Sequence, residues 1–123
     1  MAGENVLIDT NVIVYLIGGN KVTAELLMGC HLHFSFISEI ELLSFKKLSS
    51  KEEQIIRSIL SESIVFQSDA QIISNAIELR KEYGLEVPDA IIAATAIRFN
   101  LPLISVDRDM LKVKELQLIS YTI

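Results

Sequence analysis

Short apolar runs alternate along this chain with longer segments in which apolar positions have helical spacing. Apolar runs bounded by polar residues are typical of buried strands, and apolar positions three and four residues apart are typical of helices. The pattern predicts strands at residues 5–8, 31–36, 64–66, 103–106 and, at a sheet edge, 118–120. It predicts helices at residues 10–17, 21–28, 38–48, 50–62, 69–83 and 88–99, then a short helix or turn at 108–114. This alternation favours a parallel sheet covered by helices on both faces.

Two of the predicted helices begin at sequences typical of a capping box. Ser50 is followed three residues later by Glu53, and Ser68 is followed three residues later by Gln71. We expect the second of these helices to end before Gly84. One of its faces carries Ile73, Ala76, Ile77 and Arg80.

The helix that begins at Pro88 carries an acid on its apolar side. At about 100° per residue, Asp89 shares a face with Ile92 and Ala93, whereas Arg98 lies on the opposite face. An inward carboxylate is costly unless it is paired, hydrogen-bonded or bound to a metal. Asp89 also suits a plain first-turn position, where the helix dipole favours negative charge.

Two more acids follow short apolar runs that we expect to be strands. Asp9 comes directly after the run at 6–8, and Asp107 comes directly after the run at 103–106. In open α/β sheets, ligands bind outside the carboxyl ends of the strands. Both aspartates are therefore candidate site residues, although each could also be a simple N-cap.

Glu41 is the acid that capping does not explain. On a helix over 38–48, Glu41 falls within the apolar arc that contains Phe45 and Leu48, and Glu39 falls beside Lys46 on the other side. We therefore expect Glu41 to face inward and Glu39 to face solvent.

Four inward acids without obvious cationic partners indicate a site for a divalent metal. These acids are Asp9, Glu41, Asp89 and Asp107. Carboxylates without a histidine or thiolate cluster suit Mg²⁺, with Mn²⁺ as an alternative.

Four segments resemble, in order, the four motifs of PIN-domain ribonucleases. The segments are Leu7–Asn11, Ser35–Leu43 with Glu41 at the acidic position, Pro88–Ala96 and Leu101–Met110. Ser105 stands where many relatives have threonine, so a hydroxyl is kept. The resemblance covers nearly the whole chain and is closest to VapC-type toxins of toxin–antitoxin pairs.

The resemblance implies an α/β PIN-like fold and a Mg²⁺-dependent endoribonuclease that hydrolyses phosphodiester bonds in RNA. It implies that the four acids are both the catalytic residues and the metal ligands. It also implies a homodimer and a small antitoxin protein as partner. The residues expected to support the site are Thr10, Asn11, Ser105 and, as a further carboxylate of the fourth motif, Asp109.

Length and composition narrow the class of protein further. The 123 residues favour one domain over residues 1–123. The net charge of −5 argues against a large basic surface that grips nucleic acid. No apolar run approaches the roughly 20 residues of a membrane span, and residues 1–5 lack the features of a signal peptide. We expect a soluble, cytoplasmic protein that does not enter a membrane.

The apolar content of 50% requires either a large hydrophobic core or a partner that covers part of the surface. Residues 12–17, in the first predicted helix, are all apolar or aromatic. A helix that is apolar all round is buried on more than one side. A simple buried helix and a contact with a second chain both fit this pattern. Cys30 is the only cysteine, which excludes an intramolecular disulfide.

Three alternatives remain open at this stage. One is a different magnesium enzyme, such as a haloacid-dehalogenase-type phosphatase. That class needs a second aspartate two positions after the first, where this chain has Asn11. Another is a non-catalytic PIN-like module that binds RNA or protein, which would typically have lost a site acid. The last is a PIN nuclease of RNA processing outside any toxin–antitoxin system.

Overall fold

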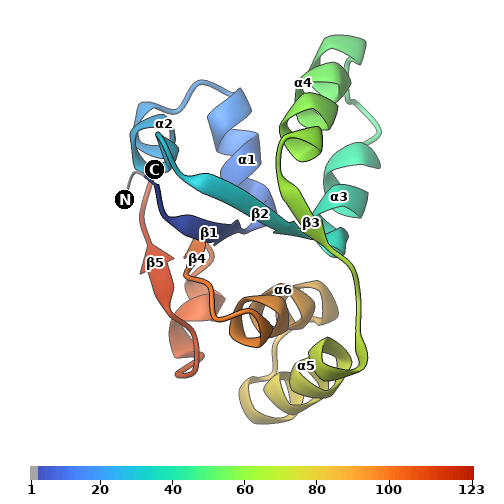
Figure 1. Ribbon diagram of the computed structural model, residues 1–123, viewed down its shortest axis with the longest axis vertical. Coiled ribbons are helices and arrows are strands. Elements are labelled where there is room, and N and C mark those ends of the chain that lie inside the picture. The colour runs from blue at the N-terminus through green and yellow to red at the C-terminus, as the bar shows by residue number, and fades with distance from the viewer. Residues whose placement is uncertain (1–2) are drawn as a thin grey trace.

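A parallel sheet of five strands forms the centre of the computed structural model, which describes residues 3–123 (Figure 1). The strands are β1 (Asn5–Ile8), β2 (His31–Ser35), β3 (Ile64–Phe66), β4 (Leu103–Ser105) and β5 (Leu118–Ser120). Their order in the sheet is β3-β2-β1-β4-β5, and every neighbouring pair is parallel. The predicted parallel sheet is therefore confirmed. Residues 1 and 2, which begin the predicted domain and the N-terminal segment considered above, lie outside the described residues.

Helices cover both faces of this sheet, as the sequence predicted. They are α1 (Thr10–Ile17), α2 (Lys21–Leu27), α3 (Phe36–Leu43), α4 (Ser50–Ser61), α5 (Ala70–Tyr83) and α6 (Val87–Arg98), with a 3₁₀ helix η1 (Arg108–Lys112). In Figure 1 the first four helices lie above the sheet, and α5 and α6 lie below it. Each of these helices within residues 3–123 is too short or too polar to span a membrane.

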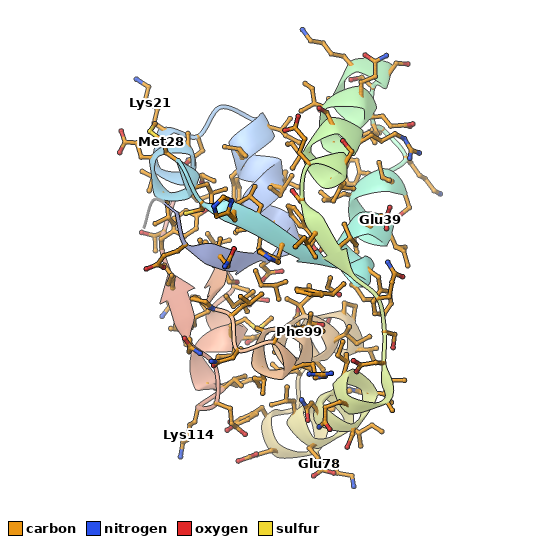
Figure 2. The ribbon with its side chains drawn as sticks, viewed as in Figure 1. Lys21, Met28, Glu39, Glu78, Phe99 and Lys114 are labelled. Atoms are coloured by element: carbon orange, nitrogen blue, oxygen red, sulfur yellow. The ribbon has the colours of Figure 1, made fainter. Side chains whose placement is uncertain are left out.

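The central strand β1 is buried on both of its faces. Leu7 belongs to the core under α5 and α6, whereas Val6 and Ile8 belong to the core under α1 and α4. Burial on both faces explains why this strand is a continuous apolar run. The rings of Phe66 and Phe99 stack with centroids 3.9 Å apart. Figure 2 labels Phe99, which lies between the sheet and α6.

The capping box of α4 exists, but it begins one residue earlier than predicted. Ser49 Oγ accepts a hydrogen bond from the Glu52 N–H at 3.1 Å, and the Glu52 carboxylate accepts one from the Ser49 N–H at 3.0 Å. The predicted pair of Ser50 and Glu53 is therefore wrong. Two serines in succession are followed by two glutamates in succession, so both registers have the spacing of a capping box.

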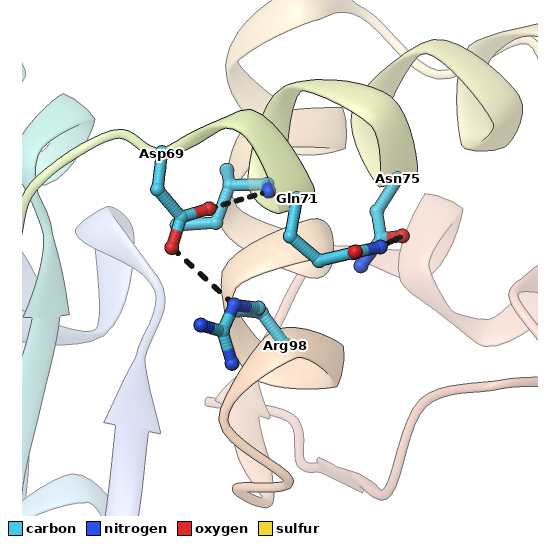
Figure 3. A network of polar contacts seen from close by, with 5 residues as sticks. Asp69, Gln71, Asn75 and Arg98 are labelled. Carbon is cyan, nitrogen blue, oxygen red and sulfur yellow. Dashed lines mark hydrogen bonds and ion pairs between the residues drawn. The ribbon is translucent and has the colours of Figure 1, made fainter.

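The capping box predicted at Ser68 is also wrong. Asp69 caps α5, and its Oδ1 accepts a hydrogen bond from the Ile72 N–H at 2.7 Å. The Asp69 Oδ2 lies 3.3 Å from Arg98 Nε, so the same carboxylate joins the start of α5 to the end of α6 (Figure 3). A carboxylate forms stronger charge-assisted hydrogen bonds than a hydroxyl, which favours Asp69 as the cap.

Several helices keep exposed apolar side chains, and two of these helices, α5 and α1, bear on the predictions made above. On α5, the buried residues are Ile72, Ala76 and Leu79, so the helix turns Ile73 and Ile77 toward solvent, 54% and 49% exposed. The other helix is α1, whose Val12 and Ile13 are buried while Val14 is 53% exposed. Of the two explanations left open for the apolar α1, the exposed Val14 excludes a helix that is fully buried within this chain, and a contact with a second chain stays a prediction.

Candidate active site

The candidate site lies at the carboxyl edge of the sheet, beside the ends of β1 and β4. From β1 the chain builds the sheet outward through β2 and β3, and it later returns to the other side of β1 as β4. Such a reversal of strand order leaves a crevice in which α/β proteins bind ligands. Asp9 directly follows β1, Asp107 follows β4 by two residues, and Asp89 lies in the first turn of α6.

Asp9 is held by hydrogen bonds to both of its carboxylate oxygens. Its Oδ1 accepts from the Thr10 N–H at 2.8 Å, and its Oδ2 accepts from Ser105 Oγ at 2.6 Å. The side chain is only 6% exposed. Burial raises the pKa of Asp9, against the lowering effect of the hydrogen bonds from Ser105 and Thr10. Asp9 therefore caps α1 and at the same time presents a fixed carboxylate to the sheet edge.

Ser105 connects the two strand-end acids. Its fully buried hydroxyl donates to Asp9, and the same oxygen accepts a hydrogen bond from the Asp107 N–H at 3.0 Å. Asp107 in turn accepts a hydrogen bond on its Oδ1 from the Asp109 N–H at 2.9 Å. These bonds explain why a hydroxyl residue at position 105 suits the site.

Asp89 is half-buried among other acids. Burial and, after it, the negative charges of Asp107, Asp9, Glu86 and Glu41 in that order of importance together raise the pKa of its carboxyl to about 7. An aspartate that is only partly ionised near neutral pH marks a place where negative charge is crowded. Within residues 3–123, no ion pair with a lysine or arginine relieves that crowding at any of the candidate acids.

Three carboxylates could together hold a metal ion. Oxygens of Asp89, Asp107 and Asp109 all lie within 4.8 Å of one another. Oxygen ligands of this kind suit Mg²⁺ or Mn²⁺. Two of the four predicted ligands belong to this group, and its third member is Asp109, which the sequence ranked as a supporting residue. Asp9 and Glu41 lie outside the group but close enough for their charges to raise the pKa of Asp89.

Glu41 reaches the site from α3 along the surface and is not buried. It is exposed, and its Oε1 accepts a hydrogen bond from Thr10 Oγ1 at 2.7 Å. Glu39, predicted to face solvent, is half-buried on α3 (Figure 2). Both predictions of burial are wrong because α3 runs from Phe36 to Leu43 and is capped by Ser35, so the helical positions predicted up to residue 48 do not exist.

A groove of about 880 Å³ opens next to Glu41. Its walls come from α1, α3, α4 and the segment between the last two, and its lining includes Thr10 and the exposed Asn11. Val14 and Phe45, 53% and 66% exposed, provide apolar surface in this groove. Lys46 and Lys47 also line it. The supporting residues Thr10 and Asn11 therefore lie between the acidic cluster and an open groove.

Sequence reasoning missed Ser38. This serine is fully buried, and its Oγ lies 2.9 Å from Thr10 Oγ1. The one available signal was its position three residues before Glu41, because residues at that spacing lie on the same side of a helix.

Comparison with known proteins shows the family and the fold. The model of the PIN domain family matches residues 6–116. Among curated proteins, no match is found. A chain of a toxin–antitoxin complex from Klebsiella pneumoniae shares 30% sequence identity at a TM-score of 0.84, and the alignment covers 96% of this chain and 99% of that one.

Two further solved structures come from VapBC pairs. The chain of VapBC-1 from nontypeable Haemophilus influenzae is 28% identical at a TM-score of 0.71, with 94% of this chain and 97% of that chain covered. The chain of VapBC2 from Rickettsia felis, in a structure bound to a DNA fragment from their promoter, is 24% identical at a TM-score of 0.78. That alignment covers 96% of this chain and 99% of that one, and it supports the fold alone. By its matched residues and its fold, the chain belongs to the PIN domain family.

Proposed function

We propose that this protein is a Mg²⁺-dependent endoribonuclease and the toxin of a toxin–antitoxin pair. PIN domains are generally nucleases. The observation that supports the proposal most directly is the convergence of Asp89, Asp107 and Asp109 at the carboxyl edge of the sheet, without a cationic side chain paired to them in residues 3–123. Uncompensated carboxylates are costly, and a bound dication would relieve that cost.

Each acid has a distinct role in this proposal. Asp89, Asp107 and Asp109 would hold the metal, and Asp9 and Glu41 would add negative charge beside them. A divalent ion held by these carboxylates would supply Lewis-acid chemistry, in which the pKa of a water is lowered and negative charge on the phosphodiester is stabilised. Asp9, fixed by hydrogen bonds from Thr10 and Ser105, keeps its orientation when substrate enters.

The substrate is proposed to be RNA, on the resemblance of the four motifs to those of PIN ribonucleases. The negative net charge of the chain gives little general attraction to a polyanion. Local contacts must therefore hold the strand, and Lys46 and Lys47 beside the site are suitably charged for its phosphates. Asn11, exposed at the groove and one residue from Thr10, is placed to hydrogen-bond a phosphate or a water.

A small antitoxin is the proposed protein partner. The solved structures with this fold include a toxin–antitoxin complex and several VapBC complexes. The groove beside Glu41 exposes Val14 and Phe45, and an apolar segment of an antitoxin would bury both side chains. A segment bound there would also obstruct access to Glu41.

We further propose that residues 1–123 form one domain and that the active protein is a cytoplasmic homodimer. The apolar side chains of Ile73 and Ile77 on the solvent side of α5 support a self-association surface. The site itself is built from side chains of one chain.

The test is cleavage of a mixed RNA pool by the purified, antitoxin-free protein with Mg²⁺ or with EDTA. Asp89→Asn keeps the shape of the side chain and removes its charge, so we expect it to abolish cleavage. Asp69→Asn is the matched control because Asp69 also begins a helix but lies outside the site. Cleavage that persists in EDTA or in Asp89→Asn would contradict the proposal. RNA binding that needs neither Mg²⁺ nor Asp9 would favour the non-catalytic alternative.

A further inference from the structure

We propose that Ser38 is a positioning residue that fixes Glu41 at the metal site through the hydroxyl of Thr10. The inference rests on the proposed function, because it takes Glu41 to lie beside a bound metal ion. It adds a residue that is not an acid and whose hydrogen bond found within residues 3–123 goes to Thr10, not to a carboxylate.

The hydrogen bonds have a defined direction. Thr10 Oγ1 lies 2.7 Å from Glu41 Oε1 and 2.9 Å from Ser38 Oγ. A hydroxyl has one proton, and an ionised carboxylate can only accept. Thr10 therefore donates its proton to Glu41 and must accept from Ser38. The chain of bonds runs from Ser38 through Thr10 to Glu41, so the removal of the first hydroxyl frees Thr10 to rotate away from the carboxylate.

Burial explains why Ser38 can serve as the fixed end of this chain. Ser38 is fully buried, whereas Glu41 is exposed on the same helix. Hydroxyls inside helices commonly bond to the carbonyl four residues earlier. Thr95 does so, with its Oγ1 donating to the Ile91 carbonyl at 2.7 Å. The hydrogen bond found for the Ser38 hydroxyl instead crosses from α3 to α1, toward the site.

The consequence for Glu41 is a preset orientation. Thr10 is the hydrogen-bond donor found for this side chain within residues 3–123, and it occupies Oε1. The other oxygen, Oε2, would then be available to a metal ion or to a water beside it. A glutamate free in solvent would lose conformational freedom on binding, and a partner that orients it in advance reduces this loss.

A purely structural role for Ser38 makes a different prediction. In that case Ser38 would hold α3 against α1, and its loss would weaken metal binding whether or not Glu41 is present. If Ser38 acts through Glu41, its loss matters only while Glu41 is there. A double-mutant cycle separates the two cases.

The experiment is calorimetric titration of Mn²⁺ into wild type, Ser38→Ala, Glu41→Ala and the double variant, without RNA. We expect Ser38→Ala to weaken Mn²⁺ binding about tenfold, the usual size for an outer partner of a ligand. We expect no further loss when Ser38→Ala is added to Glu41→Ala. Thr10→Val removes the middle hydroxyl and should weaken Mn²⁺ binding as much as Ser38→Ala does. If Ser38→Ala does not fold, Thr10→Val takes its place in the cycle.

Ser35→Ala is the matched control. Ser35 is equally buried at the start of α3, but its hydroxyl accepts from the Ile37 N–H and does not point to Thr10. We expect it to lower stability and leave Mn²⁺ affinity unchanged. Equal Mn²⁺ affinity in wild type and Ser38→Ala would overturn the inference, as would a tenfold loss that persists in the Glu41→Ala background. Wild type that binds no Mn²⁺ would instead overturn the metal site of the proposed function.

Discussion

Replacing Asp89 by asparagine should stabilise the metal-free protein. The folded state raises the pKa of this carboxyl from 3.8 to about 7, chiefly by burial and by the charges of Asp107 and Asp9. The folded protein therefore binds more protons at this site than the unfolded chain between those pH values. Its free energy of unfolding falls as the pH rises through that window and levels off above pH 7.

The magnitude follows from the same values. At about 1.4 kcal/mol per pH unit, the difference between 3.8 and about 7 corresponds to at most about 4 kcal/mol at alkaline pH. Asp89 is only half-buried, and solvent screening reduces the effect to about 1–2 kcal/mol. Asparagine has nearly the same shape and no charge, so Asp89→Asn should gain this amount at pH 8 and almost nothing at pH 4.

Urea unfolding of wild type and Asp89→Asn in EDTA, at several pH values between 4 and 8, measures this difference. Asp69→Asn is the control, because Asp69 lies 3.3 Å from Arg98 and loss of its charge should be neutral or destabilising. Added Mg²⁺ should reverse the order at pH 8, because it binds the wild-type cluster more tightly. An Asp89→Asn variant that is less stable than wild type in EDTA at pH 8 would refute the argument from crowded charge.

Four other substitutions test three separate parts of the structure. Ser105→Ala should lower the free energy of unfolding by about 1–3 kcal/mol in urea, because Asp9 and the Asp107 N–H lose a buried partner. Ser49→Ala should cost about 1 kcal/mol in the same assay and Ser50→Ala distinctly less; the opposite order would contradict the capping box seen here. Val14→Asp should leave thermal unfolding nearly unchanged but weaken antitoxin binding at least tenfold in calorimetry, and unchanged affinity would exclude the groove.

The strands and the order of elements were predictable because each buried segment has its own apolar pattern. In β1, three apolar residues between polar ones left little doubt about the strand or its end, and this also placed Asp9 at the sheet edge. The same reasoning placed Asp107 after β4. Helical periodicity added Asp89 and Glu41 as further inward acids, and the family resemblance assigned all four acids to one site. The match to the PIN domain family and the sheet topology confirm the fold.

The errors arose where neighbouring residues offer equal signals. Ser49 and Ser50 are both followed by a glutamate at the spacing of a capping box, so the sequence does not show which serine is the N-cap. On α3, a boundary placed too late in the chain reversed the expected burial of Glu39 and Glu41. For Ser38 the sequence offered only its spacing from Glu41, because its partner Thr10 is 28 positions away and the contact depends on how α1 and α3 pack.

The strand order also decides when the acidic site can form during synthesis. Ser105 and Asp9 are bonded across 96 positions of the chain, and β4 lies between β1 and β5 in the sheet. While the ribosome is still translating, β1 and β2 can already pair, but Asp9 has no partner from β4. The nascent chain therefore cannot complete its cluster of carboxylates until β4 has left the exit tunnel.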